Sequence, residues 1–244
     1  MKRLIKTLAI LYIIPKLSLF ANSILPIDTN IKMQMIKGNT WRENCPIKIK
    51  DLRYLQVPYY GFDNKIHKGE LIVHKSVANE VTKIFEELKK IKYPIYKMKL
   101  ASYYKGNDNE SMKHNNTSAF NCRLMTGSKT KWSKHSFGKA IDINPLQNPY
   151  VKGKKVLPKE GAKYIGLNRK HLSLQADDRA IIIQGDKIIR VFKKFGWIWG
   201  GDWKRVKDYQ HFEKKFKPTS SKVKKAVPKS LFQQLNKAET EGAF

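Results

Sequence analysis

The sequence predicts an α+β domain in which helices flank a small antiparallel sheet. Residues 76–91 and 187–195 repeat apolar side chains at helical spacing, whereas residues 96–100 and 140–144 alternate as strands do. These helices and strands do not alternate along the chain as they would around a parallel sheet. Without an N-terminal signal, about 220 residues remain, which is enough for one domain with a substantial core.

Residues 1–23 are expected to be a secretory signal. A positively charged start precedes an apolar run over 8–19, and a small-x-small cleavage site follows at 21–23. The alternative is a membrane anchor, but Pro15 and Lys16 interrupt a run that is already shorter than the roughly 20 apolar residues of a spanning helix. We therefore expect an exported protein, either periplasmic or associated with the cell wall.

Residues 24–60 are expected to be an N-terminal extension, and they contain one of the two cysteines. An oxidising compartment permits Cys45 and Cys122 to pair. Equally, Cys122 lies between Phe120 and Leu124 and can be a small buried hydrophobic residue. The sequence leaves both alternatives open.

The segment 76–91 is the clearest helix. We expect Ser76 to cap it and Pro94 to stop it, with an apolar face that packs in the core. The alternation over 96–100 then predicts a strand with Tyr96, Met98 and Leu100 on one face. The polar run over 105–116 predicts a loop.

The stretch 131–145, KWSKHSFGKAIDINP, contains a histidine and a carboxylate seven residues apart. Gly138 and Pro145 argue against a helix through it. Strand alternation instead places Asp142 on one face and the neighbouring isoleucines on the other. We expect His135 on a turn, a bend at Gly138, and Asp142 on a strand whose opposite face is buried.

These two side chains predict a zinc ion (Zn2+) as cofactor. Catalytic zinc normally has three protein ligands and a fourth position for water. The segment 207–213, KDYQHFE, supplies His211 next to carboxylates that can act as a base, so His135, Asp142 and His211 are the expected metal ligands. The remaining histidines are expected to be ordinary surface or core residues: His67, His74, His114 and His171.

The second helix, over 187–195, is expected to end at Gly196. In the following aromatic segment we expect Trp197 and Trp199 to be buried and Trp203 to lie nearer the site, where it can contact substrate. Residues 218–244 are expected to be a loosely held basic tail.

Three motifs in these segments resemble a known family. SKHSFGKAIDINP, followed by GWIWGGDW and DYQHFE, is similar to the zinc D-Ala-D-Ala metallopeptidases, which include D-alanyl-D-alanine carboxypeptidases and the L-alanyl-D-glutamate endopeptidases of phage endolysins. The family patterns S-x-H-x-x-G-x-A-x-D and D/E-x-x-H are matched by Ser133, His135, Gly138, Ala140, Asp142, Asp208 and His211. The resemblance implies a zinc peptidase domain over 61–217 with a hedgehog/DD-peptidase-like fold.

The resemblance also implies roles for residues around the metal. Arg123 matches a family arginine that contacts the substrate, and a guanidinium can clamp a carboxylate or stabilise an oxyanion. Asp208 is the expected general base towards a zinc-activated water, with Glu213 as its competitor or as a ligand or indirect supporter of the metal. Ser133 is expected to orient His135 or a strand end.

The formal charge of +29 falls to +25 without the signal, which carries four basic and no acidic residues. Lysines carry most of this charge without a nucleic-acid-binding motif, so anionic cell-wall or membrane surfaces are the expected partners and nucleic acid is not. We expect a zinc metallopeptidase that cuts peptidoglycan stem peptides as a D,D-carboxypeptidase or as an L-Ala-D-Glu type endopeptidase. The alternative is a non-catalytic, basic cell-wall-binding module that retains the peptidase fold.

Overall fold

The N-terminal part of the chain builds the largest sheet of the structure, a computed structural model that describes residues 21–215. The α-helices are α1 (Thr29–Lys37), α2 (Ala78–Lys90), α3 (Asp108–Lys113), α4 (Ala176–Arg179) and α5 (Lys187–Lys194). The strands are β1 (Ser23–Pro26), β2 (Leu52–Gly61), β3 (Ile66–His74), β4 (Pro94–Ile95), β5 (Lys97–Met98), β6 (Asn116–Thr117), β7 (Ala140–Asp142), β8 (Tyr150–Lys152), β9 (Lys155–Leu157), β10 (Trp197–Trp199), β11 (Lys207–Asp208) and β12 (His211–Lys214).

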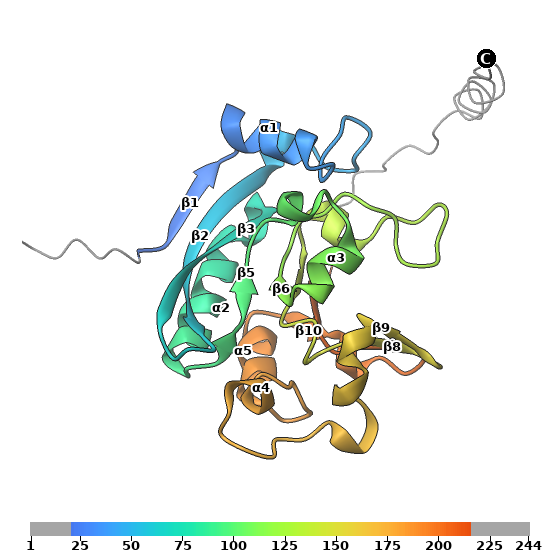
Figure 1. The fold of residues 1–244 in the computed structure, drawn as a ribbon. Helices are drawn as coiled ribbons and strands as arrows, with labels where there is room; N and C mark the ends of the chain where they lie inside the picture. Colours follow the sequence, from blue (N-terminus) through green and yellow to red (C-terminus); the bar gives the residue numbers. More distant parts are fainter. Residues whose placement is uncertain (1–20, 216–244) are drawn as a thin grey trace, which may run out of the picture.

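In this sheet, β2 pairs antiparallel with β1 and β3, and β4 joins β2 in parallel. Helix α2 lies against the inner side of the curved strands (Figure 1). Leu55 and Val57 of β2 and Val81 and Phe85 of α2 are fully buried in one core cluster. Burial of side chains of this size stabilises a fold by roughly 1.5–3 kcal/mol each, so this packing anchors the rest of the domain.

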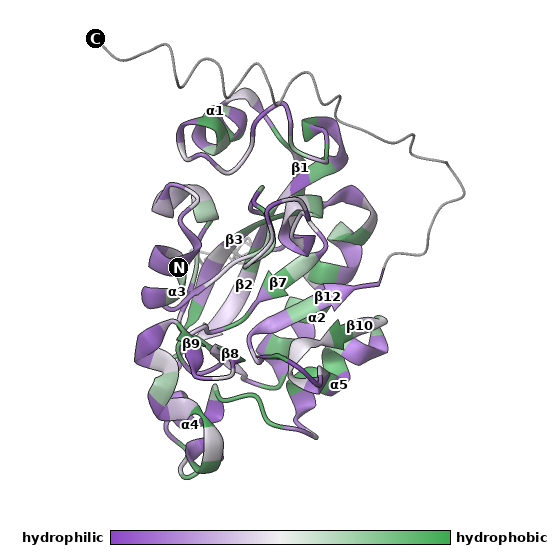
Figure 2. Ribbon diagram, turned by 90° about the vertical axis from the view of Figure 1, so that its right-hand side faces the viewer, coloured by the Kyte–Doolittle hydropathy of each residue, from purple (hydrophilic) through white to green (hydrophobic). Residues whose placement is uncertain are grey.

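The second sheet has the order β10-β12-β7 and is antiparallel throughout. Phe192 of α5 stacks on Phe212 of β12 with ring centroids 3.8 Å apart and meets Trp197 edge-on. This contact joins α5 to the sheet. In Figure 2, green marks apolar residues within β7 and β10, whereas α3 is mainly hydrophilic. The predicted α+β class with a small antiparallel sheet is confirmed.

Helix α2 confirms the helix predicted over 76–91, with a different cap. The side chain of His74, and not that of Ser76, accepts a hydrogen bond at the preceding 3-10 turn (Lys75–Val77). The helix ends at Lys90, and Lys92 adopts a positive φ of 52°, so the chain turns before it reaches Pro94. Helix α5 confirms the second helix, and Gly196 follows it at φ 73°.

Two predictions between these helices are wrong in part. The strand expected over 96–100 is limited to β5, and Tyr96 is 52% exposed, whereas Met98 and Leu100 are buried. The loop expected over 105–116 contains α3, because the Asn107 side chain accepts from the backbone N–H of Glu110 and caps a six-residue helix.

The boundary expected before residue 61 does not separate two units in the structure. β1 and β2 lie within the range 24–60 and are part of the core sheet. Helix α1 packs nearby through Met35, which shares a second core cluster with Leu52 and Phe120. Cys45 and Cys122 form a disulfide with their Cα atoms 6.0 Å apart, which ties this N-terminal region to the segment that leads to the site.

The expected tail over 218–244 and residues 1–20 of the expected signal lie outside the described residues, whereas Ser23 is the first residue of β1. Over residues 21–215, no helix is long and apolar enough to cross a membrane.

Candidate metal centre

The β7–β12 pair positions two of the three predicted ligands. Asp142 and His211 are directly opposite each other in this antiparallel pair, so their side chains project from the same face. On the other face, Ile141 of β7 and Ile143 just after it are fully buried in the core. The strand predicted to present Asp142 is therefore present, with the predicted side buried.

The third ligand comes from a 3-10 turn (Lys134–Phe137). The Ser133 side chain accepts from the backbone N–H of His135 at 3.3 Å and caps this turn, which agrees with its expected orienting role. Gly138 then takes a φ of 63°, and its carbonyl accepts from the backbone N–H of His74 at 2.8 Å. The turn is thereby fixed against the end of β3.

Gly138→Ala is expected to destabilise the domain by about 2–4 kcal/mol, since an alanine is strained at positive φ and its Cβ has no room. A Cβ at this position would lie 2.5 Å from the backbone nitrogen of His74. Chemical denaturation of the variant and of Gly153→Ala measures the difference. Gly153 also has a positive φ but meets nothing within 4 Å, so equal losses in the two variants would contradict the packing argument.

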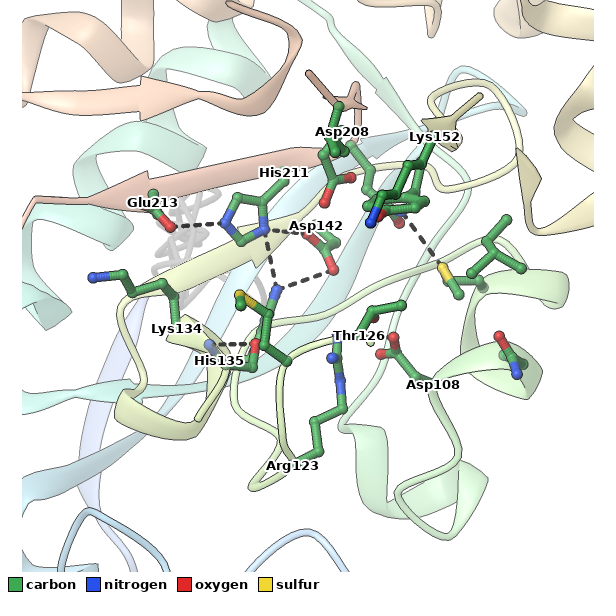
Figure 3. Close-up of a pocket in the computed structure, with 18 of the residues that line it drawn as sticks. Asp108, Arg123, Thr126, Lys134, His135, Asp142, Lys152, Asp208, His211 and Glu213 are labelled. Atoms are coloured by element: carbon green, nitrogen blue, oxygen red, sulfur yellow. Dashed lines mark hydrogen bonds and ion pairs between the residues drawn. The ribbon is translucent and has the colours of Figure 1, made fainter. Parts of the chain in front are cut away.

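Three donor groups converge at one point (Figure 3). The Nε2 of His135 lies 3.2 Å from Nδ1 of His211, and the two carboxylate oxygens of Asp142 lie 3.1 Å from the first and 3.0 Å from the second. All three residues are at most 6% exposed. The predicted ligands are thus brought together in a buried cluster.

The partners of the two outer histidine nitrogens determine the tautomer of each imidazole ring. Nδ1 of His135 faces the carbonyl oxygen of Ala119 at 2.5 Å, and Nε2 of His211 faces a carboxylate oxygen of Glu213 at 3.2 Å. Both partners are acceptors, so each outer nitrogen donates its proton and leaves the lone pair of the inner nitrogen towards Asp142. Two lone pairs and a carboxylate therefore point at one another, which is stable only with a cation between them.

The pKa values of Asp142 and His211 also indicate that a positive charge is needed between these side chains. Burial raises the pKa of Asp142, but the charges and hydrogen bonds of His135 and His211 outweigh burial and hold it far below its ordinary range. Burial lowers the pKa of His211, but hydrogen bonds to Asp142 and Glu213 raise it to about 10. The cluster holds a positive charge at its centre, which is either a proton or a metal ion that displaces it.

The donor set fits zinc. Ligands at 2.0–2.1 Å from a tetrahedral ion lie about 3.3 Å from one another, close to the separations found here. Histidine nitrogen and carboxylate oxygen are both zinc ligands, and Glu213 and the Ala119 carbonyl supply the outer hydrogen bonds that usually orient ligating histidines. Glu213 thus contacts the nitrogen of His211 that points away from the cluster.

Asp208 lies on the cavity side of the cluster (Figure 3). Its Oδ1 is buried without a hydrogen-bond partner. Burial raises the pKa of Asp208 to about 7, while the charge of His211 lowers it and that of Asp142 raises it further. A carboxylate with a pKa near neutrality is suited to accept and return a proton.

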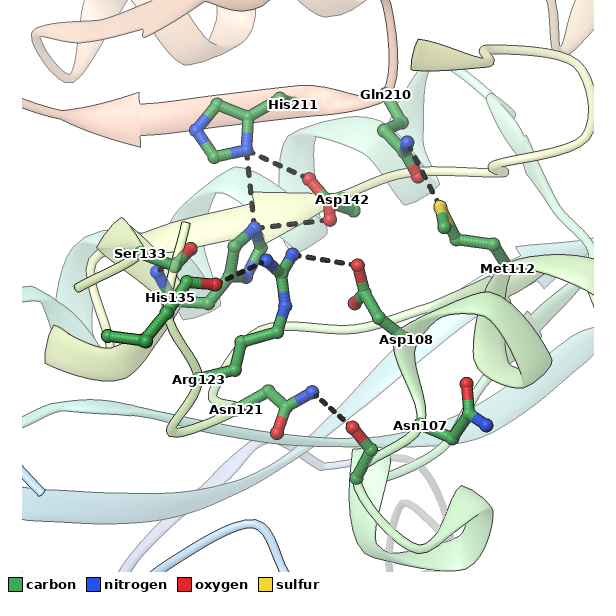
Figure 4. Close-up of polar contacts among 12 residues, drawn as sticks. Asn107, Asp108, Met112, Asn121, Arg123, Ser133, His135, Asp142, Gln210 and His211 are labelled. Atoms are coloured by element: carbon green, nitrogen blue, oxygen red, sulfur yellow. Dashed lines mark hydrogen bonds and ion pairs between the residues drawn. The ribbon is translucent and has the colours of Figure 1, made fainter. Parts of the chain in front are cut away.

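Arg123 is held by a residue that the sequence did not indicate. Its Nη2 lies 2.8 Å from a carboxylate oxygen of Asp108 in α3, and its Nη1 donates to the carbonyl of Leu124 (Figure 4). Its Nε is buried without a partner. The guanidinium thus lies in the cavity in a fixed orientation.

A cavity of about 510 Å³ contains the cluster and all the predicted site residues. Trp203 lines it with its ring centroid 5.4 Å from that of His211, whereas Trp197 and Trp199 are buried as predicted. The other four described histidines do not line the cavity. Each forms a hydrogen bond with a group within ten residues of it in the sequence: Asp63 for His67, Ser76 for His74, the Glu110 carbonyl for His114 and the Ile181 carbonyl for His171.

Comparison with known protein families supports the interpretation of the motifs. Residues 126–214 match the family model described as D-alanyl-D-alanine carboxypeptidase, a family of zinc metallopeptidases. The resemblance predicted from the sequence is confirmed over this segment, which includes the three candidate ligands and Asp208. Arg123 and Asp108 lie before it. No curated protein and no solved structure matches the chain.

Proposed function

We propose that this protein is an exported zinc metallopeptidase that hydrolyses peptide bonds in the stem peptides of peptidoglycan. The observation that carries the proposal is the convergence of two histidine lone pairs and a carboxylate at the floor of a cavity that also holds a buried, unpartnered carboxylate oxygen. Structural zinc sites usually have four protein ligands, whereas three ligands beside a cavity are typical of catalysis.

The metal and the residues around it have separate roles in this reaction. Zinc, when bound, supplies polarisation of the scissile carbonyl and a water of lowered pKa. Asp208 accepts a proton from the attacking water and returns it to the leaving amine. Arg123, held by Asp108, donates to the substrate carboxylate or to the developing oxyanion. Glu213 keeps His211 in the tautomer that binds metal.

Export is supported by the signal-like N-terminus and by the Cys45–Cys122 disulfide, since disulfides persist mainly in oxidising compartments. The matched family description favours removal of a terminal D-alanine, and cleavage between L-alanine and D-glutamate is the other candidate reaction.

Digestion of purified muropeptides by the zinc-loaded chain tests the proposal. We expect a loss of mass equal to one alanine from a carboxypeptidase, or separation of the stem from its first residue by an endopeptidase. A chelator should abolish either product and added zinc should restore it. Unchanged muropeptide masses with zinc bound would contradict the proposal.

The second candidate is a wall-binding module that keeps the fold without catalysis, favoured by the formal charge of +25 that remains when the four basic residues of the signal are subtracted from +29. It predicts binding to intact sacculi without cleavage of any soluble muropeptide. If the lysines also hold an active enzyme on the wall, sacculus binding should weaken above roughly 0.15 M salt, where the screening length falls below about 8 Å, while cleavage of small fragments stays constant.

A further inference from the structure

One wall of the cavity is a sheet with the order β11-β8-β9. Asp208 of β11 pairs with Tyr150 of β8, and Tyr150 pairs with Leu157 of β9. Residues two apart on a strand share a face, and so do residues directly opposite each other. The cavity-lining residues follow this rule, because they include these three side chains but neither Val151 nor Val156.

Two lysines form the next row of the same face. Lys152 lies two residues beyond Tyr150, and Lys155 is its direct partner across the β8–β9 hairpin. Both side chains line the cavity and both residues are exposed. Like charges directly opposite each other on paired strands destabilise the pair unless something neutralises them.

The protein supplies no such partner within the part of the chain that the structure describes. The ion pairs at the cavity join Arg123 to Asp108 and the two histidines to Asp142 and Glu213, and none includes Lys152 or Lys155. Asp208 is the remaining acid in the lining; its Oδ1 is buried, and it forms no ion pair with either lysine.

The ion pair between Arg123 and Asp108 increases the importance of Lys152 and Lys155 as cationic groups in the cavity. An arginine already paired at 2.8 Å with Asp108 has lost part of its capacity to neutralise a second carboxylate. In the view of Figure 3, Arg123 and Asp108 lie on one side of the cavity, and Lys152 is drawn on the other, beside Asp208. A substrate that crosses the cluster would meet the paired arginine at one side and the free lysines at the other.

We propose that Lys152 and Lys155 form an anion subsite that binds a carboxylate of the peptide substrate. The inference rests on the proposed peptidase function and specifies its substrate as an acidic peptide. The lysine row is about 7 Å from the Asp208 row, which is two residues of strand at about 3.3 Å each. A lysine from this row reaches a carboxylate within one or two residues of the bond that is cut.

The test compares a stem peptide that has free carboxylates with the same peptide after amidation of every carboxylate. We expect the native chain to show the lower KM for the free acid. In the K152Q/K155Q double variant the KM for the free acid should rise about 5- to 10-fold with kcat nearly constant, as expected for two partly exposed charge contacts. The amidated peptide should show no change.

The matched control is K68Q/K170Q, which removes the same charge from two exposed lysines outside the cavity. An equal rise in KM in this control, or an equal rise for the amidated peptide, would overturn the subsite. If neither peptide is cut, the proposed function fails, and calorimetric binding of both peptides to the zinc-loaded chain still decides the subsite. A free-acid preference that is clearly smaller in K152Q/K155Q than in the native chain supports the subsite, since Arg123 still contributes to it, and an unchanged preference refutes the subsite.

Discussion

Replacement of His211 by alanine is expected to remove the zinc and the peptidase activity together. The inner nitrogen of His211 lies 3.2 Å from that of His135 and 3.0 Å from Asp142, so its loss leaves two of the three protein ligands. Loss of an outer-sphere partner alone lowers zinc affinity by roughly 10- to 100-fold, and loss of a ligand exceeds this. Metal analysis after dialysis should give about one zinc per native chain and almost none for the variant.

His135→Ala should behave in the same way, and His67→Ala is the matched control. His67 pairs with Asp63 and does not line the cavity, so the His67→Ala variant should keep both zinc and activity. Full zinc content in both ligand variants would show that His135 and His211 are not zinc ligands. Zinc lost from all three variants would indicate unfolding, which circular dichroism of the same samples detects.

The cluster could be predicted from the sequence because its constraints are local. Gly138 and the strand-forming residues after it restrict how His135 and Asp142 can be arranged, and few residue types serve as zinc ligands. The pairing of His211 opposite Asp142 depends on strand register across 69 residues, which spacing does not determine. The carboxylates around His211 indicated it as a ligand, but its position directly opposite Asp142 is seen only in the structure.

The partner of Arg123 could not be predicted for a different reason. Asp108 lies in a polar run without hydrophobic periodicity, and α3 has only six residues. Its helical state depends on the Asn107 cap and on contacts with the rest of the fold. Tertiary packing decides the structure of such short polar segments, and sequence patterns carry little of that information.

The sequence pattern does not indicate the core role of β2, although most of its residues are apolar or aromatic. Buried side chains occur on both faces of β2, so the simple alternation of a half-exposed strand is absent. Pro58 within the strand further weakens the sequence signal, since proline is rare inside sheets. The family motifs begin far beyond this strand, at Ser133, so they carry no information about its place in the core.

Asp208→Asn should retain zinc and lose about 10²- to 10⁴-fold in kcat, because an amide cannot accept the proton of the attacking water. The acidic side of the native kcat/KM profile should report deprotonation of Asp208. Burial raises its pKa to about 7, and a bound cation lowers it from there, so activity should rise with pH through a midpoint below about 7. In the variant this rise should disappear.

Glu213→Gln separates the base from the carboxylate that orients His211. Glu213 lies 3.2 Å from the outer nitrogen of His211, so its amide variant should weaken zinc binding by roughly 10- to 100-fold. Its kcat should recover when zinc is saturating, whereas no zinc concentration should rescue Asp208→Asn. A Glu213→Gln enzyme that binds zinc normally and is inactive, beside an active Asp208→Asn enzyme, would reverse the two roles. That reversal would place the proton acceptor on β12, on the side of His211 opposite the three-donor cluster.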